Sequence, residues 1–83
     1  MTYTRKNKGV CSLSTEVTLT DDGVIESVTV VGGCNGNLKG VSSLLVGMDA
    51  ADAIRRMRGT TCGPRPTSCP DQIALALEEA LAK

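Results

Sequence analysis

The chain offers almost no large aromatic side chains from which to build a core. Its 83 residues include no Phe, no Trp and one Tyr, so the core must come from Val, Leu, Ile, Ala and three Met. A domain of this length buries only about 60% of the surface that its unfolded chain exposes. Ordering the chain costs about 1.5 kcal/mol of conformational entropy per residue, so the net free energy of folding from such a small aliphatic core should be near zero. We therefore expect residues 1–83 to form a single domain that needs a further cross-link.

Cysteines are the candidates for that cross-link. In a small chain, four cysteines form either two disulfides or one metal site, and the redox compartment decides between them. The first eight residues are polar and basic, without the apolar segment of a secretory leader, so we expect a cytoplasmic protein with reduced thiols. Gly, Asp or Arg interrupts every apolar run, so we expect no membrane-spanning segment. The four cysteines are Cys11, Cys34, Cys62 and Cys69.

Two segments rich in β-branched residues predict an antiparallel hairpin. Over residues 10–20 the apolar residues, Leu13 among them, share parity with Cys11, which predicts a strand with one apolar face. An Asp-Asp-Gly turn signal leads into a second strand over residues 24–31. The start of the first strand then lies beside the end of the second, so we expect Cys11 and Cys34 to lie close together. The polar residues before the hairpin are interpreted as a basic arm.

Two helices are predicted after the hairpin. Apolar residues at helical spacing from Leu38 to Leu45 predict the first. The second begins near Asp49, where Asp49 and Asp52 resemble an acidic variant of a capping box. Gly59 is expected to end it.

The last helix has the strongest start signal in the chain. Ser68 is a good N-cap, Pro70 suits the first turn, and Asp71 occupies the capping-box position. Apolar residues then recur every four positions from Ile73 to Leu81, which predicts a stripe that packs on the sheet. The predicted fold class is α+β: an N-terminal antiparallel β-hairpin followed by three helices, pinned by a four-cysteine site.

The positions of the cysteines favour a metal site more than their spacing does, since there is no Cys-x-x-Cys pair. Each cysteine lies at the edge of a predicted element or in a loop rich in Gly or Pro. Four thiolates suit a closed, tetrahedral structural zinc site, which can contribute about 10 to 16 kcal/mol to folding. Iron or an iron–sulfur cluster uses the same ligands. The alternative, a buried inert thiol, applies best to Cys11 on its apolar strand face.

Two further functions use part of the same sequence. Cys62 and Cys69 could cycle between dithiol and disulfide, because a helix N-terminus at Cys69 and the nearby Arg65 favour the thiolate. A phosphate, nucleotide or nucleic acid could contact four arginines: Arg55, Arg56, Arg58 and Arg65. Two observations favour the simpler interpretation that these arginines form a solvated helix face: charged residues are typical of such a face, and the net charge of the chain is zero. The chain has no His, which excludes Ser-His-Asp and Cys-His catalysis, and we assign no catalytic residue.

Three motifs carry a resemblance to a known family. They are Thr67-Ser68-Cys69-Pro70-Asp71, Cys62-Gly63-Pro64-Arg65-Pro66 and Gly32-Gly33-Cys34-Asn35-Gly36-Asn37. Together with Cys11 they resemble the TSCPD domain family, and in particular its short stand-alone branch with four cysteines. The resemblance covers nearly the whole chain. It implies that Cys11, Cys34, Cys62 and Cys69 correspond to the four cysteines of the family.

Larger relatives carry this domain at the C-terminus of adenosylcobalamin-dependent ribonucleotide reductases. The resemblance therefore implies that the cysteines bind zinc or take part in thiol chemistry. It also implies an association with ribonucleoside-diphosphate reductase, which is an oxidoreductase, and a link to nucleotide binding and DNA-precursor synthesis. A chain of 83 residues is too small to hold a catalytic barrel, a radical site and a cobalamin pocket. We expect an accessory module with a protein partner in nucleotide metabolism. We also expect a homodimer, because the unpaired edges of a hairpin favour strand addition between copies.

Overall fold

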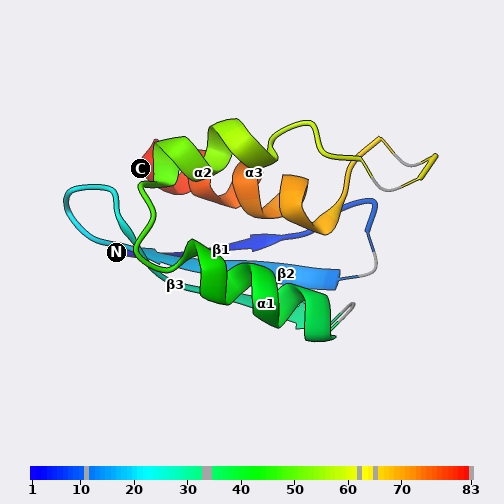
Figure 1. Cartoon of the computed structure of the whole chain (residues 1–83), viewed down its shortest axis with the longest axis horizontal. Helices are drawn as coiled ribbons and strands as arrows, with labels where there is room; N and C mark the ends of the chain where they lie inside the picture. Colours follow the sequence, from blue (N-terminus) through cyan, green and yellow to red (C-terminus); the bar gives the residue numbers. More distant parts are fainter. Residues whose placement is uncertain (11, 33–34, 62, 65, 83) are drawn as a thin grey trace.

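The computed structural model describes residues 1–10, 12–32, 35–61, 63–64 and 66–82. A three-stranded antiparallel sheet in the order β1-β2-β3 is followed by three helices (Figure 1). The predicted α+β class, with a hairpin followed by three helices, is confirmed, and the sheet has one strand more than expected. The elements are β1 (Thr2–Lys6), β2 (Ser12–Leu19), β3 (Ile25–Gly32), α1 (Asn35–Leu45), α2 (Ala50–Met57) and α3 (Cys69–Leu81).

The additional strand, β1, occupies the segment that the sequence suggested was a basic arm. It pairs antiparallel with β2, with Thr2 opposite Thr18 at one end. Its inward residues, Tyr3 and Arg5, are half-buried, and the alternate residues, Thr2, Thr4 and Lys6, are exposed. Because both sets are polar, the strand carries no apolar alternation for a periodicity argument to detect.

The hairpin of β2 and β3 forms as predicted but contains a β-bulge near its open end. Ser12 pairs with Gly32, whereas Ser14 pairs with Val31, so the register shifts between the two serines. Ser12 is consequently only 3% exposed and Leu13 is 64% exposed. The predicted inward position of Leu13 is wrong, because the extra residue of a bulge reverses the face on which the preceding side chains lie.

The helices cover one face of the sheet. Helix α1 packs along β3, α3 packs on β2 and β1, and α2 packs on α3 (Figure 1). The enclosed core is aliphatic, as expected, and its alanines allow α2 and α3 to approach closely. Its largest fully buried apolar side chains are Val17, Ile25, Ile73 and Leu77. None of the helices in the described ranges has the length and apolar character needed to cross a bilayer.

The helix ends confirm two sequence signals and correct a third. Ser68 is the N-cap of α3, and Gly59, with a φ of +84°, follows the end of α2. Asp49 is the N-cap of α2, but its side chain makes no capping hydrogen bond. Asp52 instead pairs with two arginines of its own helix. The predicted acidic capping box is therefore wrong at this helix.

Candidate thiolate site

Cys69 is the predicted site residue that the structure describes most fully. It is the first residue of α3 and is half-buried. Its Sγ lies 3.2 Å from Oγ of Ser12, the first residue of β2. Helix α3 and the bulged end of β2 thus meet at this sulfur. Cys11, Cys34, Cys62 and Arg65 lie outside the described residues, so the expected proximity of Cys11 to Cys34 stays a prediction.

A chain of buried polar groups lies behind the sulfur. Thr15 donates a 2.9 Å hydrogen bond from its Oγ1 to Oδ1 of Asn7, and Nδ2 of Asn7 donates a 2.7 Å bond to Oγ of Ser12. Thr15 is 0% exposed and Asn7 is 8% exposed. The backbone N–H of Asn7 also donates to the carbonyl of Leu13. Every buried polar atom in this chain of contacts is therefore satisfied.

Sequence reasoning did not select Asn7, Ser12 or Thr15. Asn7 lay in the supposed basic arm, and Ser12 was assigned to the wet face of the strand. One signal was present: Thr15 shares parity with Val17 and therefore falls on the apolar face of β2. A hydroxyl group on that face needs a hydrogen-bond partner, and Asn7 supplies it.

Segments far apart in the sequence meet around the N-terminus of α3. Ser12 pairs with Gly32 across the end of the hairpin. Ser68 donates a 2.7 Å hydrogen bond from its Oγ to the carbonyl of Thr60. Each of these residues is one or two positions from a cysteine: Ser12 from Cys11, Gly32 from Cys34, Thr60 from Cys62 and Ser68 from Cys69.

Asp71 holds the base of the segment that precedes α3. Its buried carboxylate accepts hydrogen bonds from the backbone N–H of Gly59 at 2.8 Å, from Oγ1 of Thr67 at 2.6 Å and from Nη1 of Arg58 at 3.1 Å. Burial alone would raise the pKa of Asp71, but the bonds from Thr67, Gly59 and Arg58 outweigh it and hold the pKa below 3.8. The backbone N–H of Asp71 donates to Oγ of Ser68, as in a capping box. Its carboxylate does not bond back to the N-cap residue but accepts hydrogen bonds from the neighbouring loop.

Gln72 and Arg5 tie β1 to the same helix. Nε2 of Gln72 donates to Oγ1 of Thr67 at 2.9 Å, and its Oε1 accepts from the side chain of Arg5 and from the backbone N–H of Lys8. Nε of Arg5 forms a 2.7 Å ion pair with Glu79. The N-terminal half of α3 is thereby held by polar contacts from both the sheet and the loop.

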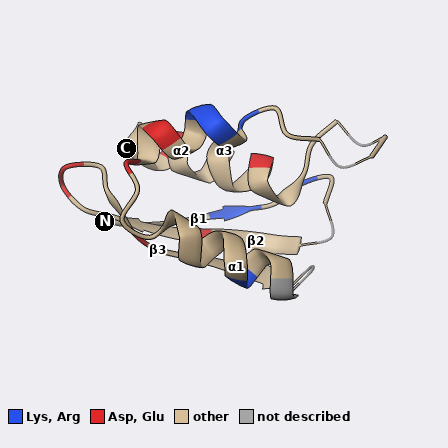
Figure 2. Ribbon diagram, viewed as in Figure 1, with Lys and Arg blue, Asp and Glu red and all other residues tan. Residues whose placement is uncertain are grey.

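The arginines predicted to contact anions have carboxylate partners where the structure describes them. Arg55 and Arg56 both pair with Asp52, so acidic and basic side chains share α2 (Figure 2). Arg58 bridges Asp71 and Glu78, and hydrogen bonds to Glu78 and then Asp71 raise its pKa. An anionic ligand at these three arginines would have to compete with those carboxylates.

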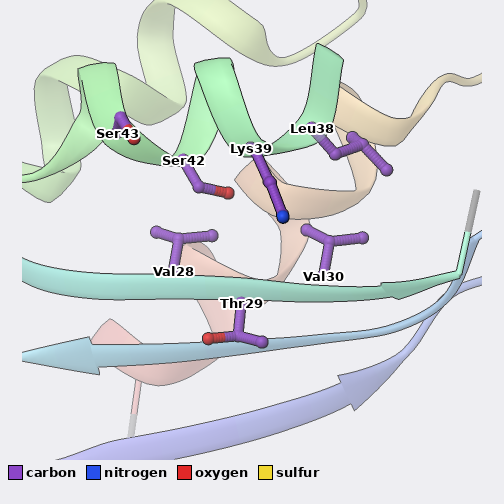
Figure 3. Close-up of a pocket in the computed structure, with 7 residues that line it drawn as sticks. All are labelled: Val28, Thr29, Val30, Leu38, Lys39, Ser42 and Ser43. Atoms are coloured by element: carbon purple, nitrogen blue, oxygen red, sulfur yellow. The ribbon is translucent and has the colours of Figure 1, made fainter. Parts of the chain in front are cut away.

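A separate cavity of about 360 Å³ lies between α1 and β3. Figure 3 shows Val28 and Val30 pointing toward α1, with the Lys39 side chain reaching down toward the strand. The cavity includes none of the predicted site residues. Its lining consists of Val28, Thr29, Val30, Leu38, Lys39, Ser42 and Ser43.

Within the described ranges, no three side chains from His, Cys, Asp or Glu come together in a way that could hold a metal ion. Three of the four predicted ligands lie outside those ranges. A family model described as the TSCPD domain matches residues 1–81. Among curated proteins and solved structures, none matches the chain.

Proposed function

From the fact that the chain belongs to the TSCPD domain family, we propose that it is a small zinc-binding accessory module. The metal ligands would be Cys11, Cys34, Cys62 and Cys69. Bound zinc would supply a structural cross-link between the open end of the β2–β3 hairpin and the loop before α3. The donor set fits this metal, because four thiolates form a closed tetrahedral site.

The main support comes from the contacts around Cys69. Ser12 touches its sulfur, Gly32 pairs with Ser12, and Thr60 is hydrogen-bonded to Ser68. Consecutive Cα atoms are about 3.8 Å apart. Each remaining cysteine is one or two positions along the sequence from Ser12, Gly32 or Thr60, which supports a joint site with Cys69.

The need for a cross-link also supports the proposal. The core is built from Val, Leu, Ile and Ala, and the buried alanines contribute little apolar area. A structural zinc site can add about 10 to 16 kcal/mol of apparent binding free energy to the folded state. The chain would then depend on its metal for stability, as other small metal-binding domains do.

The proposed biological role is that of a partner-binding module in nucleotide metabolism. It follows from the resemblance to domains carried by ribonucleotide reductases, which act in DNA-precursor synthesis. In this role the chain would act in the cytoplasm and contribute a docking domain or a thiol centre to a larger assembly. It would not carry out ribonucleotide reduction by itself.

Elemental analysis of the natively purified protein tests the metal directly, with a thiol count before and after strong chelation. We expect one zinc per chain and four thiols that react only after chelation. The Cys62→Ser variant should weaken zinc binding, whereas Thr61→Ser, at the exposed neighbouring position, should not. Metal-free protein that contains a disulfide or one fast-reacting thiol would contradict the proposal.

A thiol-redox function for Cys62 and Cys69 is the second candidate. It is favoured by the half-buried sulfur of Cys69 at the N-terminus of a 13-residue helix. Rapid labelling of Cys69 by a thiol reagent in metal-replete protein would support this function. Labelling that stays slow until a chelator is added would exclude it.

A further inference from the structure

The edge of β3 that faces away from β2 already pairs with an extended segment at its start. The N–H of Ile25 donates a 2.8 Å hydrogen bond to the carbonyl of Met48, and the carbonyl of Ile25 accepts a 2.8 Å bond from the N–H of Gly47. Val24 and Asp49 form an antiparallel bridge beside them. In the described ranges, no segment pairs with this edge beyond Ile25. The rest of the edge is therefore open to an added strand.

The backbone groups of Val28 and Val30 point to this open edge. Both side chains face α1 (Figure 3), on the side of the sheet where Ile25 is buried. Along a strand the backbone direction alternates together with the side-chain face, so residues on one face direct their N–H and C=O groups to the same side. Ile25 directs its groups away from β2. The neighbouring strand agrees, because Leu19 on the core face of β2 donates its N–H to Met1 and not to β3. Val28 and Val30 thus offer their donors and acceptors along the edge.

The cavity of about 360 Å³ lies beside these backbone groups, because Val28, Thr29 and Val30 line it from β3. Its volume falls within the range of about 300 to 1,000 Å³ that is typical of ligand sites. A strand added to β3 would send every second side chain to the α1 side of the sheet, where the cavity lies. Binding by strand addition takes its affinity from backbone hydrogen bonds and its specificity from pockets of this kind.

Lys39 gives the cavity a positive charge. Its side chain reaches from α1 toward β3, and Ser42, on the next turn, also points toward the strand (Figure 3). Among the described residues Lys39 forms no ion pair, whereas every described arginine does. A carboxylate on an incoming side chain would supply a partner for this ammonium group. The cavity therefore suits an acidic side chain.

A second copy of the chain would use the same edge in the homodimer expected from the sequence. In a symmetric antiparallel pair, the second β3 would bring its own Val28 and Val30 to the α1 side. Valine offers no carboxylate to Lys39. Charge complementarity therefore favours a different occupant.

We propose that the groove between α1 and β3 binds an extended peptide segment of another protein, with an acidic side chain that pairs with Lys39. The peptide forms backbone hydrogen bonds with Val28 and Val30 and runs antiparallel to β3, as the segment at Asp49 does. This inference rests on the proposed partner-binding role. The residues that carry it are not proposed metal ligands, so it does not depend on zinc.

A phage-displayed library of short random peptides, selected on the full-length protein as purified, tests the specificity. We expect the wild type to enrich peptides with Asp or Glu at one position and β-branched residues around it. Lys39→Glu should reverse the preference to Lys or Arg. The matched control, Lys6→Glu, makes the same charge change at an exposed position of β1 and should keep the acidic preference. No enrichment, or an acidic preference that persists in Lys39→Glu, would overturn the proposal.

Calorimetric titration with one enriched peptide measures the affinity. Lys39→Ala should weaken binding by about fivefold, as expected when one exposed ion pair is lost. Lys39→Glu should weaken it by more than about tenfold, because like charges then meet. N-methylation of the peptide, one residue at a time, should abolish binding at every second position, since only alternate N–H groups point to β3. Binding that tolerates every N-methyl group would overturn strand addition.

Two further outcomes separate this inference from the other proposals. Elemental analysis of the same sample reports the zinc content. Zinc-containing protein that enriches no acidic peptide would overturn the peptide groove and leave the zinc function standing. Metal-free protein that enriches acidic peptides would support the groove while the zinc function fails. Enrichment of peptides that copy residues 25–32 would identify a second copy as the occupant and overturn the proposal.

Discussion

The backbone N–H of Gly59 donates a 2.8 Å hydrogen bond to Oδ1 of Asp71. Gly59 follows α2 and Asp71 lies in the first turn of α3, so this bond closes the base of the segment over residues 60–68. Thr67 and Arg58 donate to the same carboxylate. A negative charge at a helix N-terminus is also favoured by the helix dipole. Asp71 therefore stabilises both the helix and the loop.

Replacement of Asp71 by Ala should lower the free energy of unfolding by about 2 to 3 kcal/mol, because the hydrogen bonds from Gly59, Thr67 and Arg58 to its buried carboxylate are lost. Urea unfolding of the two proteins measures the difference. Asp52→Ala is the matched control: its carboxylate is 30% exposed and pairs with surface arginines, so we expect a loss of less than about 1 kcal/mol. Equal losses in the two variants would show that the Asp71 contacts add nothing beyond a surface ion pair.

Ser68→Ala should cost about 1 to 2 kcal/mol, because the variant loses the N-cap of α3 and the bond to the Thr60 carbonyl. Thermal unfolding followed by circular dichroism reports the change. Ser27→Ala, at an exposed position of β3, should leave the transition within experimental error. A shift as small as that of the control would mean that the cap does not contribute to the stability of the fold.

The pKa of Tyr3 lies above its ordinary value of 10.0, mainly because its hydroxyl donates to Glu79. Tyr3 is the single tyrosine, so tyrosinate absorbance reports on it alone. We expect a midpoint above pH 10 that falls toward 10 in Glu79→Gln. The control variant Glu26→Gln, at an exposed position of β3, should keep the wild-type midpoint. A wild-type midpoint at or below 10, or equal shifts in both variants, would contradict this assignment.

The same pKa shift predicts a loss of stability at alkaline pH. The folded state holds the phenolic proton more tightly than the unfolded state does, so the contribution is fully present below about pH 10. It is lost as the pH rises through the folded-state value. Tyr3→Phe has no phenolic proton to lose, so its stability should fall less steeply over that range. Parallel pH profiles for the two proteins would exclude the contribution of Tyr3.

A homodimer formed by strand addition would use the edge of β3 that does not pair with β2. In the described ranges no strand pairs with this edge, and only Val24 and Ile25 meet the segment over residues 47–49. We expect Val31→Lys, which adds a charge to the edge strand, to reduce dimer formation in sedimentation experiments. Thr4→Lys on β1 is the control and should not. A monomer at high concentration in the wild type would contradict strand addition between copies.

The hairpin and the helices could be predicted because their signals are local. The Asp-Asp-Gly turn lies between two β-branched segments, and Ser68 caps α3 with the hydrogen bond that its position implies. Apolar spacing correctly identified Ile73 and Leu77 as buried residues of α3. These elements depend on residues within a few positions of each other, which is the range that a single sequence reports well.

Strand β1 and the bulge could not be predicted, because distant contacts determine them. Tyr3 and Arg5 face inward only because Glu79 and Gln72 of α3 supply partners for them. Leu13 breaks the parity of its strand where Asn7 bonds to its carbonyl. No periodicity in the sequence encodes either contact. The buried polar residues of the candidate site were missed for the same reason.

The contact between Ser12 and Cys69 joins positions that are 57 residues apart, and the bond between Tyr3 and Glu79 spans 76 residues. During synthesis the inward face of β1 therefore stays uncovered until α3 has left the ribosome. Such long-range pairings fold later than local ones because the chain must first close a large loop. Any ligand set that includes Cys69 is completed only at that moment. The emergence of α3 thus determines when the proposed zinc site could form.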